Sequence, residues 1–429
     1  MAEERQFDPS ETVRGIQQIL VSDKKKIAFL FGAGTSLARR SKDALFVPAV
    51  AEMTKKVEEK IKEDASLEPA LEDIKKELLA TPMDCNVETL LTNVEDKIRV
   101  IGGGKLNTLD KQGFESFANI IRQNIQIIVS VHTKIEPGQE SLLVQYDFAK
   151  WIKNADRKYA VEIFTTNYDY LIEIGLEANE VPYYDGFTGG YMPFFNSESL
   201  EDMSFLPRQT KLWKIHGSLG LHEVVTDKKR KIVRKGTDHE DILIYPSSSK
   251  YSNSKKMPYT AFMDRLNDFL KQDDAVLFVC GYSFGDEHIN ERIFSALNTN
   301  STSHVFVLYY DVWNKDGQKG YSLTEDCKLA KIASNNRRIS VLGTHSAIIG
   351  SIYGIWKLKR EPDKADSLNT KCYFKTADLI NNTAEPKTEQ EGNEEWTGEG
   401  ELVLPDFVSF VSFLKNMIPQ NEWEDNANG

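Results

Sequence analysis

The fold is decided by the stretch Ile27-Ala28-Phe29-Leu30-Phe31-Gly32-Ala33-Gly34-Thr35-Ser36. Its first half is a continuous apolar run, which is typical of a parallel strand buried on both faces. The run stops at a glycine-rich turn, where a helix is expected to begin. Glycines let backbone N–H groups approach a phosphate, and a helix N-terminus favours an anion. The stretch therefore predicts the first strand of an α/β domain and a nucleotide-binding turn at Gly32, Ala33, Gly34, Thr35 and Ser36.

This turn departs from the fingerprint of dinucleotide-binding dehydrogenases. The pattern G-x-G-x-x-G needs a third glycine, and Leu37 stands at that position. No clean second strand with an acidic end follows about twenty residues later. A tight strand-to-helix turn without a ligand therefore stays open as the alternative interpretation.

Three further polar sequences follow predicted strands. The strand at 160–164 leads into Thr165-Thr166-Asn167-Tyr168-Asp169. The strand at 212–215 leads into His216-Gly217-Ser218, and the strand at 275–279 leads into Gly281-Tyr282-Ser283-Phe284-Gly285-Asp286. Ligands of open parallel sheets bind beyond the carboxyl ends of the strands. The four turns are therefore expected to share one cleft.

The side chains in these turns suit a nucleotide, although each also has a structural interpretation. Asn167 can bond a carboxamide, a ribose hydroxyl or a water molecule. Asp169 can hold a ribose hydroxyl or cap the following helix. His216 has the pKa range of a general base near neutral pH, but a single His is more often structural. Ser283 and Asp286 have a spacing like that of a capping box, and with Gly281 they could also form a second nucleotide contact.

The rest of the chain divides around this α/β domain, which is expected to take residues 26–50 and 159–360. Residues 1–25 are expected to hold an N-terminal helix, and residues 51–158 a helical insertion with repeated apolar faces. A further strand is expected at 242–245. Residues 361–429 form a C-terminal extension with an acidic linker and an apolar helix. That helix would start at Asp406 and pack either on its own domain or on another subunit.

Composition excludes several classes of protein. The chain has 429 residues, 40% of them hydrophobic, and a net charge of −12, which argues against direct nucleic-acid binding. No apolar run approaches the roughly 20 residues that span a bilayer, and the polar N-terminus is no signal peptide. The four cysteines form no CxxC pair, so no zinc is expected, and single cysteines suggest a reducing, cytoplasmic location.

Together the four turns resemble a known family. Gly32-Ala33-Gly34 with Ser36, Thr165-x-Asn167-x-Asp169, His216-Gly217 and Gly281-x-Ser283 resemble, in this order, the sirtuin fold. The variants Thr-Thr-Asn-Tyr-Asp and Gly-Tyr-Ser-Phe-Gly-Asp look like the sirtuin-like branch of prokaryotic antiviral defence systems. The resemblance covers roughly residues 26–50 and 159–345. It implies a Rossmann-like parallel sheet of sirtuin type with a large helical insertion and a C-terminal extension.

The resemblance also implies an activity. Enzymes of that branch hydrolyse NAD to ADP-ribose and nicotinamide and so deplete NAD in the infected cell. By motif match the catalytic pair is Asn167 and His216, and NAD is the substrate. The residues expected to bind NAD are Gly32, Ala33, Gly34, Thr35, Ser36, Thr166, Asp169, Gly281, Ser283 and Asp286.

The resemblance also implies binding partners and one motif outside the four turns. Defence sirtuins form homo-oligomers and are commonly encoded beside a ring-shaped DNA-translocating ATPase. The sequence Asn86-Val87-Glu88 is expected to open a helix near the cleft.

Two other functions remain open. An NAD-dependent protein deacylase would carry a cysteine zinc module and a Gly-Ile-Pro-Asp-Phe-Arg-type stretch after the glycine turn. Both are missing, and residues 37–48 have a different sequence. A catalytically silent scaffold that senses NAD or ADP-ribose is the third possibility, against which the intact Asn167 and His216 argue.

Overall fold

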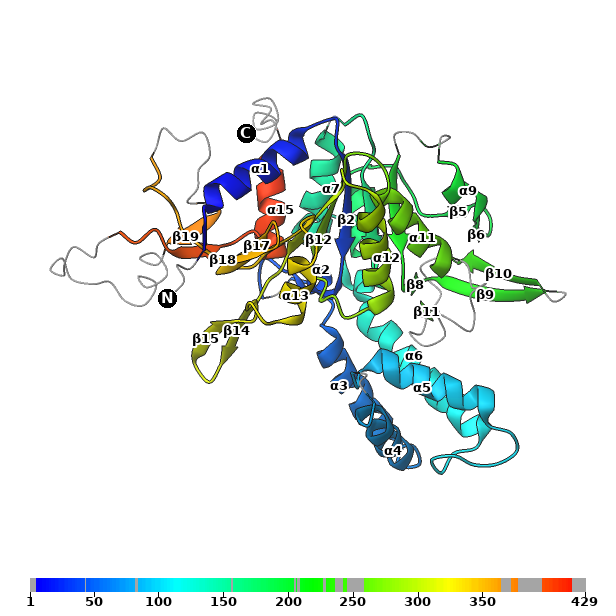
Figure 1. The fold of residues 1–429 in the computed structure, drawn as a ribbon. Helices are drawn as coiled ribbons and strands as arrows, with labels where there is room; N and C mark the ends of the chain where they lie inside the picture. The colour runs from blue at the N-terminus through cyan, green and yellow to red at the C-terminus, as the bar shows by residue number, and fades with distance from the viewer. Residues whose placement is uncertain are drawn as a thin grey trace.

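The computed structural model describes residues 5–42, 44–81, 84–155, 157–203, 206, 209–226, 229–235, 242–244, 258–363, 372–376 and 396–418. Its centre is a ten-stranded sheet with the order β1-β18-β17-β16-β13-β12-β2-β3-β7-β4 (Figure 1). The strands of this sheet, in chain order, are β1 (Gln6–Phe7), β2 (Lys26–Phe31), β3 (Glu162–Thr165), β4 (Tyr183–Tyr184), β7 (Thr210–Lys214), β12 (Ala275–Cys280), β13 (His304–Leu308), β16 (Ile339–Leu342), β17 (Ser346–Ile349) and β18 (Ile352–Trp356).

The sheet is mainly parallel, so the predicted α/β fold is confirmed. All neighbouring strands from β4 to β16 pair in parallel, and β17 is antiparallel to both of its neighbours. The apolar run of β2 lies at the centre because both of its faces are covered. Ile27, Phe29 and Phe31 belong to the core on one side of the sheet, and Ala28 and Leu30 to the core on the other. This alternation follows from the two-residue period of a strand.

Helices cover both faces of the sheet (Figure 1). The first core contains side chains of α1 (Pro9–Val21), α7 (Val144–Asn154), α8 (Leu171–Ala178) and α15 (Phe407–Lys415). The second contains side chains of α11 (Tyr259–Leu270), α12 (Glu287–Thr299) and α13 (Lys328–Ser334). The N-terminal helix expected from the sequence is therefore part of a layer that packs on the sheet.

Four further helices extend from the edge of the sheet at which the central strands end (Figure 1). They are α3 (Val50–Lys62), α4 (Glu68–Leu79), α5 (Val87–Val100) and α6 (Lys111–Val129), and they bury their apolar faces in a third core. We call α3–α6 the helical insertion. The sequence had assigned α7 to the same insertion, but α7 packs on the sheet, because its Phe148 and Trp151 contact Phe29.

The C-terminal helix α15 packs on its own domain. Asp406 caps it by accepting a hydrogen bond from the Ser409 N–H at 2.9 Å, as predicted. The ring of Phe407 lies 5.2 Å from that of Phe31, and the ring of Phe410 lies 6.3 Å from that of Phe29. The apolar face of α15 is therefore covered, and it no longer supports a subunit contact.

The strand expected at 242–245 is present as β11 (Ile242–Ile244), but it lies outside the main sheet. It pairs antiparallel with β8 (Gly217–Leu219), directly after the His216 turn. The remaining elements are α2 (Ala33–Leu37), η1 (Val131–Lys134), η2 (Glu140–Leu142), β5 (Phe187–Thr188), β6 (Phe194–Phe195), α9 (Glu198–Glu201), β9 (Leu221–Thr226), β10 (Lys229–Arg234), β14 (Val312–Lys315), β15 (Gln318–Tyr321), β19 (Phe374–Thr376) and β20 (Gly400–Leu402).

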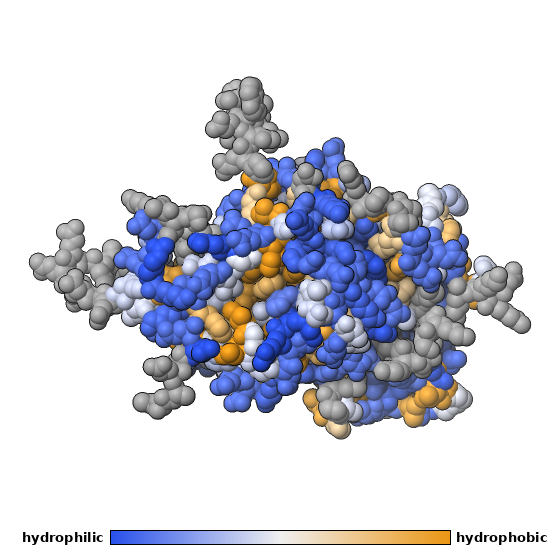
Figure 2. All heavy atoms as spheres, turned by 45° about the horizontal axis from the view of Figure 1, so that its top comes forward, coloured by the Kyte–Doolittle hydropathy of each residue, from blue (hydrophilic) through white to orange (hydrophobic). Residues whose placement is uncertain are grey.

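The face shown in Figure 2 is mostly hydrophilic, and apolar residues gather in a band in the left half of the view. Within the described ranges, no helix is long and apolar enough to cross a bilayer.

Candidate active site

The four central strands end at the same level of the sheet. Cys280 of β12 pairs with Phe31 of β2, Phe31 pairs with Thr165 of β3, and Thr165 pairs with Lys214 of β7. The turns that follow are bonded to one another as well. The Gly34 N–H donates to the Gly281 carbonyl at 3.0 Å, and the Thr166 N–H donates to the Phe31 carbonyl at 3.0 Å. The four predicted turns therefore meet, as expected.

The glycines of two turns are needed because these turns touch. A Cβ on Gly32 would lie 2.4 Å from the carbonyl oxygen of Gly281, and a Cβ on Gly34 would lie 2.7 Å from the Gly281 Cα. Gly281 itself has a φ of +63°, which disfavours other residues. The N–H groups of Gly32 and Gly34 already donate to carbonyls of the β12 end and its turn. The close packing of the two turns therefore explains why glycine stands at these positions, whether or not a phosphate binds there.

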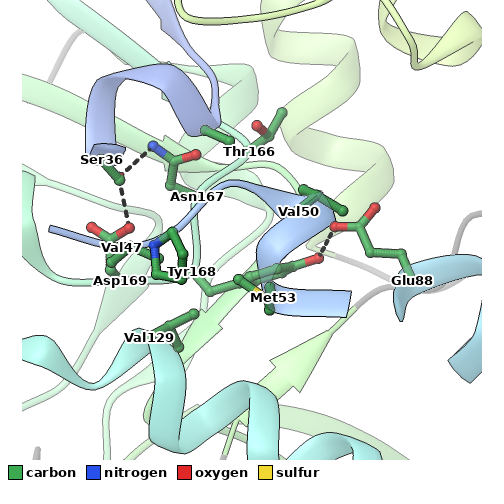
Figure 3. A pocket seen from close by; sticks show the side chains of 12 residues that line it. Ser36, Val47, Val50, Met53, Glu88, Val129, Thr166, Asn167, Tyr168 and Asp169 are labelled. Atoms are coloured by element: carbon green, nitrogen blue, oxygen red, sulfur yellow. Dashed lines mark hydrogen bonds between the residues drawn. The ribbon is translucent and has the colours of Figure 1, made fainter. Parts of the chain in front are cut away.

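Asn167 lies at the centre of a buried hydrogen-bond network (Figure 3). Its Nδ2 donates to Ser36 Oγ at 2.7 Å, and to the Gly32 carbonyl and Thr35 Oγ1, both at 3.1 Å. Ser36 in turn donates to Asp169 Oδ2 at 2.7 Å. Within the described chain the Asn167 carbonyl oxygen has no hydrogen-bond partner, so it is free to accept from a ligand. The network holds the amide at the mouth of the glycine turn.

Asp169, and Lys214 at the end of β7, are held in place by contacts with α8. Asp169 Oδ1 accepts from the N–H of Leu171, the first residue of α8, at 3.1 Å, although the N-cap position itself is Tyr170 and not Asp169. The buried ammonium of Lys214 donates to the Asp169 carbonyl and pairs with Glu173 at 2.8 Å. The sequence interpretation missed Lys214, because a lysine at the end of a strand carries no motif.

His216 is paired with a carboxylate from the fourth turn. Its Nε2 lies 3.0 Å from Asp286 Oδ2, and both side chains are nearly buried. The other oxygen of Asp286 accepts from the His288 N–H at 2.9 Å and caps α12. The capping role expected for Asp286 is therefore real, and the same carboxylate also orients His216. Gly281 and Ser283, in the same turn, are exposed.

A cavity of about 50 Å³ lies between the Asn167 turn and the helical insertion (Figure 3). Its walls come from the glycine turn, from the segment after it, from α3, α5 and α6, and from the Asn167 turn. The lining residues are Ala33, Ser36, Val47, Pro48, Val50, Met53, Glu88, Val129, Thr166, Asn167, Tyr168 and Asp169. This volume is far below the roughly 300–1,000 Å³ of sites that enclose a whole ligand. The cavity is therefore too small to enclose a whole ligand of that size.

Tyr168 connects the Asn167 turn to the insertion. Its hydroxyl donates to Glu88 Oε1 at 2.7 Å. Burial, together with the Glu88 carboxylate, raises the pKa of Tyr168 well above its ordinary value, so the phenol stays a neutral donor. Glu88 belongs to the sequence Asn86-Val87-Glu88, which was expected only to open a helix near the cleft.

The family comparison covers three of the four turns. The SIR2-like domain family matches residues 161–330, which contain β3, β7 and β12 with Asn167, His216 and Asp286. Residues 161–330 form a SIR2-like domain. The resemblance seen in the sequence is confirmed at this level. The glycine turn and Glu88 precede the matched range, and in the fold β2 pairs with β3 and β12 of the matched range.

Comparisons with individual proteins add little to the family match. No curated protein matches the chain significantly. One similar solved structure is a crystal structure of cytosolic 5′-nucleotidase IIIB bound to cytidine, with 12% identity over 72% of this chain and 81% of that chain and a TM-score of 0.26. A similarity this low carries no argument about function.

Among the residues that the structure describes, no group of three or more His, Cys, Asp and Glu side chains could hold a metal ion. Cys85, Cys280, Cys327 and Cys372 are free cysteines, and none of them belongs to the cavity wall.

Proposed function

We propose that the chain hydrolyses NAD to ADP-ribose and nicotinamide. One observation carries the proposal. Asn167 and His216 each lie two residues beyond the paired residues Thr165 and Lys214, and a carboxylate is bonded to His216. A SIR2-like domain makes NAD a plausible substrate and therefore supports the same conclusion.

The chemistry requires orientation more than acid catalysis. The bond between the ribose C1′ and the nicotinamide nitrogen breaks, and nicotinamide leaves with the electron pair as a neutral molecule. The ribose becomes oxocarbenium-like, and water then adds to C1′ and loses one proton. Asn167, with its amide N–H groups bonded to the glycine turn, has a carbonyl oxygen left to accept from the ribose, the carboxamide or the water. Fixed geometry of this kind lowers the barrier by keeping the reacting groups aligned.

His216 is the proposed general base. With Nε2 bonded to Asp286, the nitrogen that can take a proton is Nδ1, for which the described residues provide no partner. The carboxylate fixes the ring and stabilises the imidazolium that forms when the proton arrives. Asp286 is therefore a positioning residue in this proposal. A base of this kind contributes typically about 10²–10⁴-fold to the rate.

The resemblance of the turn sequences to the antiviral branch extends the proposal to NAD depletion in anti-phage defence. The homo-oligomer and the DNA-translocating ATPase partner stay predictions. The other NAD-binding residues expected from the sequence, including Thr166, Gly281 and Ser283, are proposed to contact the nucleotide from the same edge of the sheet.

The test is a product analysis. Purified protein is incubated with NAD, with and without an acetylated-lysine peptide, and the products are separated. The proposal predicts nicotinamide and ADP-ribose in equal amounts, independent of the peptide. Acetyl-ADP-ribose formed only with peptide would instead establish the deacylase. Binding of NAD or ADP-ribose without any product would establish the sensing scaffold.

A further inference from the structure

The cavity beside Asn167 has an unusual charge for a site that binds a nucleotide. Two carboxylates, those of Glu88 and Asp169, belong to its wall. None of the wall residues within the described ranges is a lysine, an arginine or a histidine. Lys214, a buried cation that donates to the Asp169 carbonyl, is already paired with Glu173 at 2.8 Å. The cavity is therefore suited to a positive charge and not to a phosphate.

The two carboxylates are not equivalent. Asp169 uses one oxygen to accept from Ser36 and the other to accept from the Leu171 N–H, so both are engaged. Glu88 uses Oε1 to accept from Tyr168 at 2.7 Å, and its Oε2 has no hydrogen bond to any described residue. Glu88 is thus the carboxylate with an oxygen left for a ligand.

Glu88 is held rigidly at this position. It lies in the first turn of α5, where the Asn86 side chain accepts from the N–H groups of Glu88 and Thr89 at 2.9 and 3.1 Å. The Val87 N–H donates to Thr54 Oγ1 of α3 at 2.9 Å. Figure 3 shows the Glu88 carboxylate directed toward Tyr168, at the side of the cavity opposite Ser36. The insertion therefore presents one fixed negative charge to the cavity.

Part of the remaining wall is apolar, beside the polar side chains of Ser36, Thr166 and Asn167. Val47, Val50, Met53 and Val129 contribute aliphatic or thioether groups that pack well against the faces of a flat ring. A flat ring with a positive charge and an amide would satisfy all parts of this wall. The oxidised nicotinamide ring of NAD has these properties, whereas the dihydronicotinamide ring of NADH is neutral.

We propose that Glu88 is a specificity-determining residue, which makes the site select NAD over NADH by its charge. The inference rests on the proposed function, because it assigns the cavity to the nicotinamide end of the same substrate. The Glu88 carboxylate attracts the pyridinium, and in a partly buried site one such interaction changes affinity by about tenfold or more.

The experiment measures binding of carba-NAD. In this analogue a CH₂ group replaces the ring oxygen of the nicotinamide ribose, so the protein cannot cleave it through an oxocarbenium ion. Dissociation constants are measured by calorimetry for the oxidised and the reduced form of this probe. The proteins are the wild type, Glu88→Gln and Glu95→Gln. Glu88→Gln keeps an acceptor for Tyr168 and removes only the charge. Glu95, on the same helix and paired with Arg122, provides the matched control.

The wild type and Glu95→Gln should bind the oxidised form about tenfold more tightly than the reduced form. Glu88→Gln should bind the two forms nearly equally, at an unchanged melting temperature. An unaltered preference in Glu88→Gln overturns the inference and leaves the hydrolase intact. A Glu88-dependent preference in a protein that releases no nicotinamide from NAD sustains the inference and overturns the hydrolase. A wild type that binds neither form overturns both.

Discussion

The contact between the glycine turn and the Gly281 turn can be tested by adding a single methyl group. Gly281 has a φ of +63°, and a Cβ there would lie 2.6 Å from the Thr35 nitrogen and 2.7 Å from the Gly34 Cα. These are backbone atoms, which cannot move aside as a flexible side chain can. Gly281→Ala should therefore displace the turn that carries Ser36 and the partners of Asn167.

The expected loss in the free energy of unfolding has two parts, which a control variant separates. An alanine in the left-handed region costs about 1–2 kcal/mol. Forcing a methyl group into a packed contact costs about 1–3 kcal/mol more. Gly350 has a φ of +61° and open space around its Cβ position, so Gly350→Ala has only the first cost. Gly281→Ala should lower the free energy of unfolding by about 2–5 kcal/mol, and Gly350→Ala by about 1–2 kcal/mol.

The assay is urea denaturation of both variants, followed by NAD turnover of the folded proteins. Displacing an aligned catalytic group by about 1 Å costs roughly 100-fold in rate. Gly281→Ala should lose turnover on that scale, whereas Gly350→Ala should keep it. Equal losses of stability in the two variants, with equal turnover, would refute the contact between the turns.

Three more predictions follow from the structure. Asp286→Asn should lower NAD turnover by about 10²-fold or more, because it weakens the orientation of His216; turnover within twofold of wild type would contradict that role. Phe410→Ala should lower the free energy of unfolding by about 3–5 kcal/mol with an unchanged KM, whereas Ser412→Ala on the exposed side of α15 should leave both quantities unchanged; equal stability of the two variants would contradict the packing of α15. Burial lowers the pKa of His304 to about 4 from 6.5, so the unfolded chain takes up the proton first. The free energy of unfolding should therefore fall as the pH falls from 6.5 to 4, and His304→Gln should reduce that fall in denaturation curves; an unchanged pH slope would contradict it.

Local signals predicted the sheet and the turns well. The run from Ile27 to Phe31 is apolar at every position, which is typical of a strand covered on both faces. Because β2, β3, β7 and β12 are parallel neighbours, the polar residues after each strand had to meet at one edge. The capping roles of Asp286 and Asp406 were equally visible, because they depend on a few adjacent residues.

Long-range contacts were not visible in the sequence. The pairing of His216 with Asp286 joins residues that are 70 positions apart, and no local pattern selects the partner. The assignment of α7 to the insertion was wrong because an apolar helix face does not reveal which core it joins. The amphipathic face of α15 left packing on the sheet and packing on a subunit equally open. Glu88 could be noticed only as part of a helix start, since its contact with Tyr168 depends on the position of the whole insertion.

The central claim is that Asn167 and His216 cleave NAD, and the most direct measurement is the rate of nicotinamide release by the wild type and three variants. The variants are Asn167→Ala, His216→Ala and the control His345→Asn, whose ring stacks on Tyr321 at 4.9 Å and takes no part in the site. Circular dichroism confirms that each is folded. The account predicts release by the wild type and by His345→Asn, and a loss of at least about 10²-fold in the other two variants. Release at the wild-type rate by folded His216→Ala would contradict it.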